Sequence, residues 1–214
     1  MTTTENTPSA SLTRPAPVLE GLAWHRAQMA KARAAADANP TTAATIERSE
    51  KKAAEKKAAE LAAIDAELGE DGTVVLVSCS GPKLEEAAAA GDLYTSPLFK
   101  KARALAEATG QPWAILSGLH GLVDPATELA PYDCRLGALS ASEKVIWNRK
   151  TRSQISNRWR GRATRFVVLA GADYAGAVAD LPAVFPLAGL QVGQRLREMN
   201  RLLAAGGLNN CEAI

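Results

Sequence analysis

The segment TVVLVSCSGPK, residues 73–83, decides the fold class. Residues 73–77 form a continuous, β-branched and mostly apolar run, which is typical of a strand buried on both faces of a parallel sheet. Small hydroxyl and thiol side chains follow this run, then Gly81 and Lys83. In α/β sheets, ligands bind outside the carboxyl ends of the strands. The segment therefore predicts a buried strand and one wall of a ligand site.

Helical and strand patterns alternate after this segment. They predict, in order, a helix at 97–109 with Ser96 as its N-cap, a strand at 112–117, a long helix at 140–160, a strand at 165–171, a short helix after Tyr174, a short strand at 184–187 and a closing helix at 192–205. This alternation is typical of an α/β sheet. We expect residues 71–206 to form an α/β domain with a central, mostly parallel sheet flanked by helices.

The N-terminal part of the chain has a different composition. Residues 1–17 are rich in Thr, Ser and Pro and predict a disordered tail. Helical patterns on both sides of the break DANPTT, residues 37–42, predict a helical hairpin or coiled-coil-like arm over residues 18–70. A spacer or self-association arm is the ordinary interpretation of this element, and a DNA-clamping arm is the alternative. Residues 207–214 are expected to be a second tail.

The composition excludes several classes of protein. The chain has three cysteines without a CxxC pair, no apolar leader at its N-terminus and no apolar run long enough to cross a membrane. We expect a soluble, cytoplasmic protein without a membrane partner. Neither GxxxxGK[ST] nor GxGxxG occurs, and no three-ligand zinc spacing is present, so we expect no cofactor and no metal.

Three predicted strands end in residues that can bind a ligand or do chemistry. Because adjacent parallel strands share one edge, these ends are expected to converge on one crevice. The candidates for substrate binding are Ser78, Cys79, Ser80, Tyr94, Ser96, Ser117, Gly121, Tyr132, Gly171 and Tyr174. Lys83, His120 and Asp133 are the candidates for catalysis.

Each of these candidates has an ordinary structural alternative. Cys79 can serve packing alone, and His120 can satisfy a backbone carbonyl in a tight loop. Asp133 can cap a turn, and Tyr174 can have an ordinary capping role. The convergence of several such residues at one sheet edge is the reason to expect a site.

A basic stretch lies within the predicted helix 140–160 and just after it. No acidic residue occurs between Lys144 and Arg165. Cations beside tryptophans are typical of proteins that contact single-stranded or flipped-out nucleic acid. This predicts a contact with nucleic acid, DNA in preference to RNA, through Arg149, Lys150, Arg152, Arg158, Trp159, Arg160 and Arg162. A solvated helix face is the alternative.

Five ordered motifs also carry a family resemblance: VLVSCSGPK, DLYTSPLFKKARALAEA, WAILSGLHGLVDP, APYD and VVLAGADY. In this order they resemble a group of bacterial and phage domains of unknown function that is similar to the peroxide-stress YaaA superfamily. The resemblance covers residues 73–205. It implies a link to DNA binding and to enzymes that exchange or modify nucleobases, and it includes the strand-end candidates named above.

Together these observations predict a protein that binds nucleic acid or a nucleotide and recognises or acts on a nucleobase, for example by cleaving or exchanging an N-glycosidic bond. Whether it turns over a substrate is left open by the residues alone. One alternative is a non-catalytic DNA-binding protein. The other is a hydrolase or transferase of small nucleosides or nucleotides.

Overall fold

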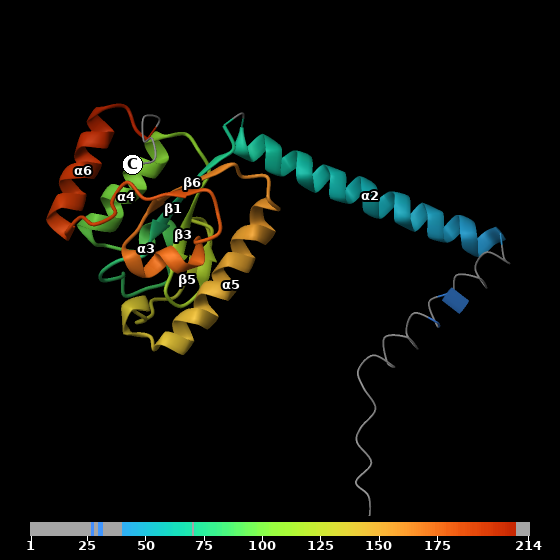
Figure 1. Ribbon diagram of the computed structural model, residues 1–214, viewed down its shortest axis with the longest axis horizontal. Helices are drawn as coiled ribbons and strands as arrows, with labels where there is room; N and C mark the ends of the chain where they lie inside the picture. Colours follow the sequence, from blue (N-terminus) through green and yellow to red (C-terminus); the bar gives the residue numbers. More distant parts are fainter. Residues whose placement is uncertain (1–26, 28–29, 32–39, 70, 209–214) are drawn as a thin grey trace, which may run out of the picture. The chain divides into compact units, whose positions relative to one another are not determined.

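A computed structural model describes residues 27, 30–31, 40–69 and 71–208 of the chain (Figure 1). They fall into two compact units, residues 1–58 and 59–214. In the first unit, the predicted tail and nearly all of the first helix of the arm lie outside the described residues. The second helix of the arm is confirmed as α2, Pro40–Leu68, whose side chains at positions 44–58 are exposed. The proposed role of the arm in self-association stays a prediction.

The second unit contains the α/β domain. Its elements are β1 (Thr73–Ser78), β2 (Ala88–Ala89), α3 (Ala90–Leu93), α4 (Pro97–Ala108), β3 (Trp113–Ser117), β4 (Gly121–Val123), β5 (Glu128–Leu129), η1 (Leu136–Ala138), α5 (Ala141–Trp159), β6 (Arg165–Leu169), η2 (Ala172–Ala177), β7 (Ala183–Val184) and α6 (Val192–Ala204). In the described part of the chain, no helix combines the length and the apolar character that crossing a membrane requires.

The main sheet has five strands in the order β4-β3-β1-β6-β7. Strand β1 lies in the centre and pairs in parallel with β3 and β6, and β6 pairs in parallel with β7. The sheet is mixed because β4 runs antiparallel to β3. The predicted α/β class with a mostly parallel sheet and flanking helices is confirmed, whereas β4 was not predicted from the sequence.

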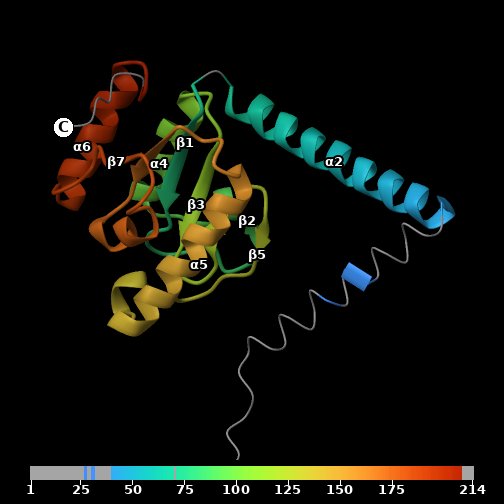
Figure 2. The ribbon, with the colours of Figure 1, turned by 45° about the vertical axis from the view of Figure 1, so that its right-hand side comes forward.

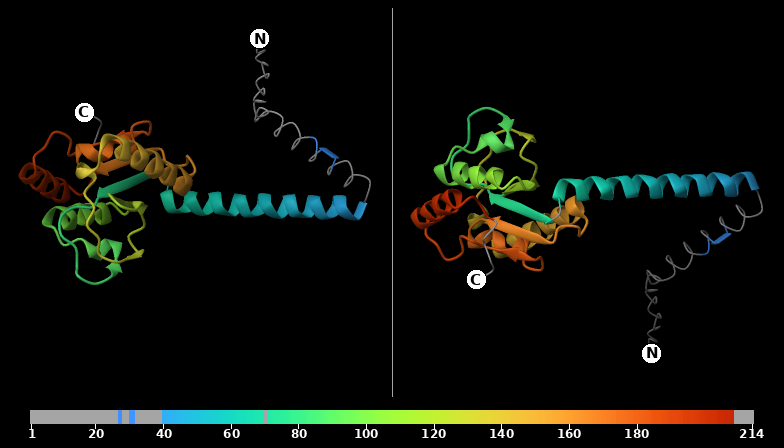
Figure 3. Two further views of the ribbon diagram at one scale, coloured as in Figure 1. Left: turned by 90° about the horizontal axis from the view of Figure 1, so that it is seen from below. Right: turned by 90° about the horizontal axis from the view of Figure 1, so that it is seen from above.

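Helices cover both faces of the sheet, as Figures 2 and 3 show. On one face, α4 and α6 pack on Val75, Val77 and their neighbours through Phe99, Leu105 and Met199. On the other face, α5 packs on the alternate residues of β1, Val74 and Leu76, through Ile155 and Trp159. Ile64 and Leu68 join this second cluster, so the last turns of α2 are part of the core of the domain.

Local sequence signals set the ends of the two helices that border the site. The Ser96 hydroxyl accepts a hydrogen bond from the Phe99 amide at 3.1 Å, which caps α4 as predicted. Ser140 and Glu143 form the expected capping box at the start of α5.

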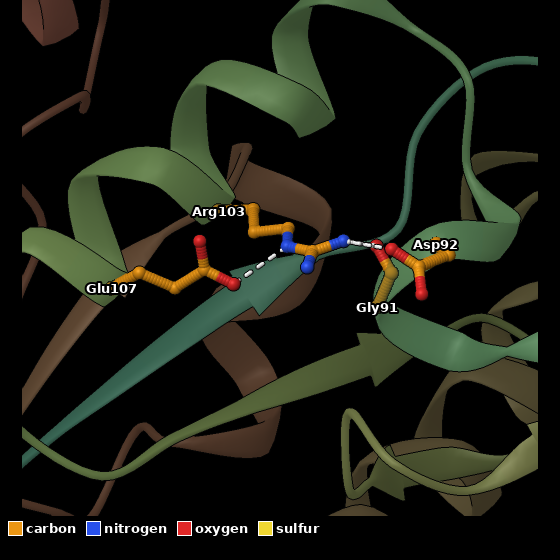
Figure 4. A network of polar contacts seen from close by, with 4 residues as sticks. All are labelled: Gly91, Asp92, Arg103 and Glu107. Carbon is orange, nitrogen blue, oxygen red and sulfur yellow. Dashed lines mark hydrogen bonds and ion pairs between the residues drawn. The ribbon is translucent and has the colours of Figure 1, made fainter.

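Arg103 ties helix α4 to the short helix α3 (Figure 4). Its Nη1 donates to the Gly91 carbonyl at 2.7 Å and pairs with Asp92, while its Nε donates to Glu107 at 2.6 Å. Because α3 ends directly before Tyr94, this network helps to hold Tyr94 in place below the loop that follows β1.

Candidate functional site

The loops after β1, β3 and β6 converge at one edge of the sheet, as the parallel order of these strands requires. A cavity of about 700 Å³ lies there, and we call it the strand-end pocket. Its lining comes from the loop after β1, from the segment before and within η1, and from η2. The lining residues are Cys79, Ser80, Gly81, Pro82, Lys83, Tyr132, Asp133, Cys134, Arg135, Leu136, Gly137, Asp173 and Tyr174.

The pocket brings together six of the thirteen predicted substrate-binding and catalytic residues: Cys79, Ser80, Lys83, Tyr132, Asp133 and Tyr174. Another three of the thirteen support this wall from behind. Ser96 lies behind Ser80, with 3.0 Å between the two hydroxyl oxygens. Ser117 and Tyr94 lie behind Tyr132. Tyr94 is only 1% exposed, so its expected role in substrate binding is corrected to a supporting role.

A chain of hydroxyl groups runs through Ser117, Tyr132 and Tyr94. The Tyr132 oxygen lies 2.7 Å from the Ser117 hydroxyl and 2.7 Å from the Tyr94 hydroxyl. The Ser117 oxygen also accepts the amides of Leu119 and His120, at 3.2 and 3.0 Å. Both acceptor positions of Ser117 are therefore occupied, and its own hydrogen is donated to Tyr132.

This pattern also fixes the direction of the bond between the two tyrosines. Tyr94 is buried, and Tyr132 is the partner of its hydroxyl among the described residues. A buried donor without an acceptor costs about 1–3 kcal/mol, so Tyr94 donates to Tyr132. Tyr132 then accepts two hydrogen bonds, and its own hydrogen has no acceptor among the described residues.

Cys79 and Tyr174 form the wall between the loops after β1 and β6. The Gly118 amide donates to the Cys79 sulfur at 3.4 Å, and the Tyr174 hydroxyl lies 3.4 Å from the same sulfur. The Tyr174 ring packs edge-on against Trp147, whose indole N–H donates to the Ser117 carbonyl at 3.0 Å. One side of the pocket is thereby joined to helix α5.

The pocket carries charges of both signs. The Lys83 ammonium lies 4.2 Å from the centre of the Tyr132 ring, which is a cation–π contact. Asp133 and Arg135 are exposed and form no ion pair with any described residue, whereas Asp173 pairs with Lys144 at 3.4 Å. Across the described residues, no group of three or more His, Cys, Asp or Glu side chains is arranged to hold a metal ion.

His120 lies outside the pocket lining, which corrects its expected direct role. Its ring makes an edge contact with Tyr132, with 5.0 Å between the ring centres. Burial, and then the nearby charge of Lys150, lower the pKa of His120, so the imidazole is neutral at neutral pH. Among the described residues, the His120 ring contacts the pocket through Tyr132, and its backbone amide contributes through Ser117.

Three further predicted residues lie beside the pocket and not in it. Ser78 donates a long hydrogen bond of 3.4 Å to the Leu169 carbonyl and joins β1 to β6. Gly121 opens strand β4 at a φ of 80° and lies against helix α5, so its role is structural. Gly171 follows β6 after one residue, Ala170, and lies against the guanidinium of Arg195.

The basic stretch between Lys144 and Arg165 differs most from its expected role as a nucleic-acid surface. Trp147 and Trp159 are 5% and 2% exposed, and Trp159 packs on Phe166 in the core. Trp159 therefore offers no face for stacking on a base, and its assignment to a nucleic-acid surface is wrong. Its four-residue spacing with Trp147, Thr151 and Ile155 is the pattern of a buried helix stripe, and this stripe lies among charged residues of the same helix.

Most of the arginines predicted for this surface have acidic partners that are distant in sequence. Arg158 and Arg160 pair with Glu67 and Glu60 at 2.8 and 3.0 Å. Arg162 binds Asp65 with two nitrogens, and Arg152 pairs with Asp180. Arg149 and Lys150 are exposed and form no ion pair with a described residue. The absence of acidic residues within the stretch suggested that these six cations are unpaired. This is corrected for four of them, which pair with acidic residues elsewhere in the chain.

Sequence reasoning did not select Arg135 and Gly137, which line the pocket next to Asp133. The motif APYD placed Tyr132 and Asp133 in the site. The position of Arg135 and Gly137 shortly after this motif was the signal that could have identified them. Gly137 allows a close approach, because a Cβ there would lie 3.2 Å from a carboxylate oxygen of Asp173.

All three tyrosines of the chain belong to this site, so their titration reports on it directly. Burial raises the pKa of Tyr94 to about 12 and raises the pKa of Tyr132 and Tyr174 further. The neutral form is favoured in the folded state, so this stability is full below about pH 10 and is lost as pH rises through about 12.

We therefore expect little tyrosinate absorbance in the folded protein near pH 10 and half-titration near that pH in urea. A spectrophotometric titration in both solvents checks this. If the folded protein formed tyrosinate near pH 10 without unfolding, the hydroxyl chain described above would be wrong.

Fold and pocket together define an α/β protein with a pocket at the carboxyl edge of a mostly parallel sheet. The chain belongs to a family of unknown function, DUF6884, whose model matches residues 74–201. That match includes most of β1, the pocket lining and most of α6. No curated protein matches the chain, and no solved structure matches it.

Proposed function

We propose that this protein binds a nucleotide, or a nucleotide unit of a nucleic acid, in the strand-end pocket and acts on its N-glycosidic bond. The observation that carries the proposal is the meeting of Lys83, Asp133 and neutral tyrosine hydroxyls in one cavity of about 700 Å³. That volume is within the usual range of small-molecule sites. The resemblance of the motifs to bacterial and phage relatives of the peroxide-stress YaaA superfamily adds support.

Hydrolysis of an N-glycosidic bond needs two kinds of group. Water adds to the anomeric carbon, the carbon–nitrogen bond breaks, and its electron pair leaves with the base, which must gain a proton. The Asp133 carboxylate is suited to stabilise the positive charge on the sugar and to take the proton from water. The free hydrogen of Tyr132 is suited to bind the departing base, with the Lys83 ammonium beside it.

The test is mass analysis of purified protein after incubation with nucleotides and with short single- and double-stranded DNA and RNA. We expect free base to be released and expect Lys83→Ala and Asp133→Asn each to lower the rate by about 100-fold. Lys100→Ala is the matched control, because Lys100 is exposed on α4 and does not line the pocket. If base release were unchanged in both pocket variants, the assignment would be wrong.

A non-catalytic nucleic-acid-binding protein is the second candidate. It is favoured by Arg149 and Lys150, which are exposed on α5 beside the exposed side chains of Val145 and Ile146. In this case binding would fall steeply with salt, would be unaffected by Lys83→Ala, and would yield no product. The same incubations therefore separate the two candidates.

A further inference from the structure

Arg195 on helix α6 is a fixed cation without an anionic partner among the described residues. Its Nε donates to the Leu190 carbonyl at 2.7 Å, which holds the guanidinium in place. The side chain is half-buried and forms no ion pair with any described residue. The two terminal nitrogens, Nη1 and Nη2, have no hydrogen-bond acceptor within the described part of the chain. Arginine placed in this way has donors ready for an anion.

The terminal nitrogens of Arg195 lie at the carboxyl end of β6. A Cβ on Gly171 would lie 3.2 Å from Nη1 and 3.7 Å from Nη2. Gly171 therefore leaves the room that lets this guanidinium reach the sheet edge. The pocket loops end at the same edge, so Arg195 belongs to the surroundings of the site although it comes from the last helix.

Arg195, Ser78 and Ser80 also line a small cavity of about 10 Å³. Its other lining residues are apolar, and no acidic side chain is among them. This space holds about one water molecule, so an anion must lie at its edge and not inside it. The Ser80 side chain is small and lines the strand-end pocket as well. A ligand atom that contacts Ser80 from the pocket therefore lies close to the cavity that Arg195 lines.

The loop after β1 adds backbone donors at this place. The amides of Ser80 and Gly81 donate to no described residue, in contrast to the amide of Cys79, which donates to the Leu116 carbonyl at 2.9 Å. Gly81 has a φ of 74°, and a Cβ there would lie 2.6 Å from the Ser96 Cβ, so the loop depends on glycine to take this shape. Successive free amides around a left-handed glycine form a concavity that suits an anion.

We propose that Arg195, together with Ser80 and the amides of the loop after β1, binds the phosphate group of a nucleoside monophosphate. This inference rests on the proposed function, because it assumes that the base and sugar occupy the strand-end pocket. Asp133 and Asp173 lie in that pocket, whereas the Arg195 cavity has donors and no acid. A phosphate beside Arg195 meets no carboxylate in that cavity, whereas in the strand-end pocket it would meet Asp133 and Asp173 as well as Lys83 and Arg135, so we place the phosphate toward Arg195.

The experiment is a calorimetric titration with the four ribonucleoside 5′-monophosphates, thymidine 5′-monophosphate and the corresponding nucleosides at low ionic strength. We expect at least one monophosphate to bind about tenfold more tightly than its nucleoside. Arg195→Gln is expected to remove this difference and to leave nucleoside binding unchanged. Arg197→Gln is the matched control, because Arg197 is exposed on the same helix and forms no ion pair with a described residue. Unchanged monophosphate binding by Arg195→Gln would overturn the proposal.

A second measurement on the unmodified protein avoids dependence on the folding of the variant. Inorganic phosphate is expected to compete with the monophosphate and not with the nucleoside, and the absence of such competition would overturn the inference. The outcome is separate from that of the proposed function. If monophosphates bind in this Arg195-dependent way but no base is released, the phosphate subsite stands and the glycosidic activity fails.

Discussion

Gly121→Ala is expected to destabilise the folded protein by about 3 kcal/mol. Gly121 has a φ of 80°, and a Cβ there would lie 2.1 Å from Oε1 of Gln154 and 3.0 Å from Oγ1 of Thr151. The Gln154 oxygen accepts the Leu122 amide at 2.9 Å, and its amide donates to the His120 carbonyl at 3.2 Å. The added methyl group would therefore break the clamp that joins the hairpin β3–β4 to α5.

Urea denaturation of Gly121→Ala and Gly189→Ala separates the steric clash from the backbone strain. Gly189 has a φ of 70° and has no atom within 4 Å of an added Cβ, so its substitution should cost only about 1 kcal/mol. The difference between the two variants measures the contact with Gln154 and Thr151. Equal losses of stability in the two variants would show that the clamp contributes nothing.

The sequence predicted those parts of the fold that depend on local signals. The apolar run of β1, the Ser96 cap and the Ser140 capping box each use neighbouring residues, and each was found in place. Strand β4 was missed because three residues carry too short a pattern, and its pairing with β3 places the segment GLV in the sheet. The two-residue strands β2 and β5 were missed for the same reason, since each is a strand only through its pairing with the other.

The site residues that lie at strand ends could be predicted from the sequence. Those that reach the site through contacts between segments distant in sequence could not. The expected convergence of strand ends placed Ser80 and Tyr174 in one site, and the order of β3, β1 and β6 brings these ends together. Arg195 was not predicted, because only the packing of α6 brings it to the end of β6. The ion pairs of the arginines after Trp147 were not predicted for a similar reason, because their partners are distant in sequence. Arg162 and Asp65, for example, are 97 residues apart and form an ion pair.

Ser117→Ala is the second substitution with a large expected effect, about 2 kcal/mol of lost stability. Ser117 is fully buried at the end of β3, and its hydroxyl serves the amides of Leu119 and His120 as well as Tyr132. Alanine leaves these groups without their partner and offers no other acceptor at that position. The serine thus contributes more than a usual hydroxyl, because one oxygen organises both the β3–β4 turn and the wall of the pocket.

Denaturation of Ser117→Ala is compared with that of Ser156→Ala, an exposed position on α5 where the same change should alter stability by less than about 0.5 kcal/mol. A second measurement connects the loss to the site, since all three tyrosines lie there. Tyrosine titration in Ser117→Ala is expected to begin closer to pH 10 than in the unmodified protein, because loosening the hydroxyl chain lets water reach Tyr132 and Tyr94. A loss of stability with an unchanged titration would mean that Ser117 supports the turn alone and that Tyr132 is held in the pocket by its other contacts, with Lys83, His120 and Tyr94.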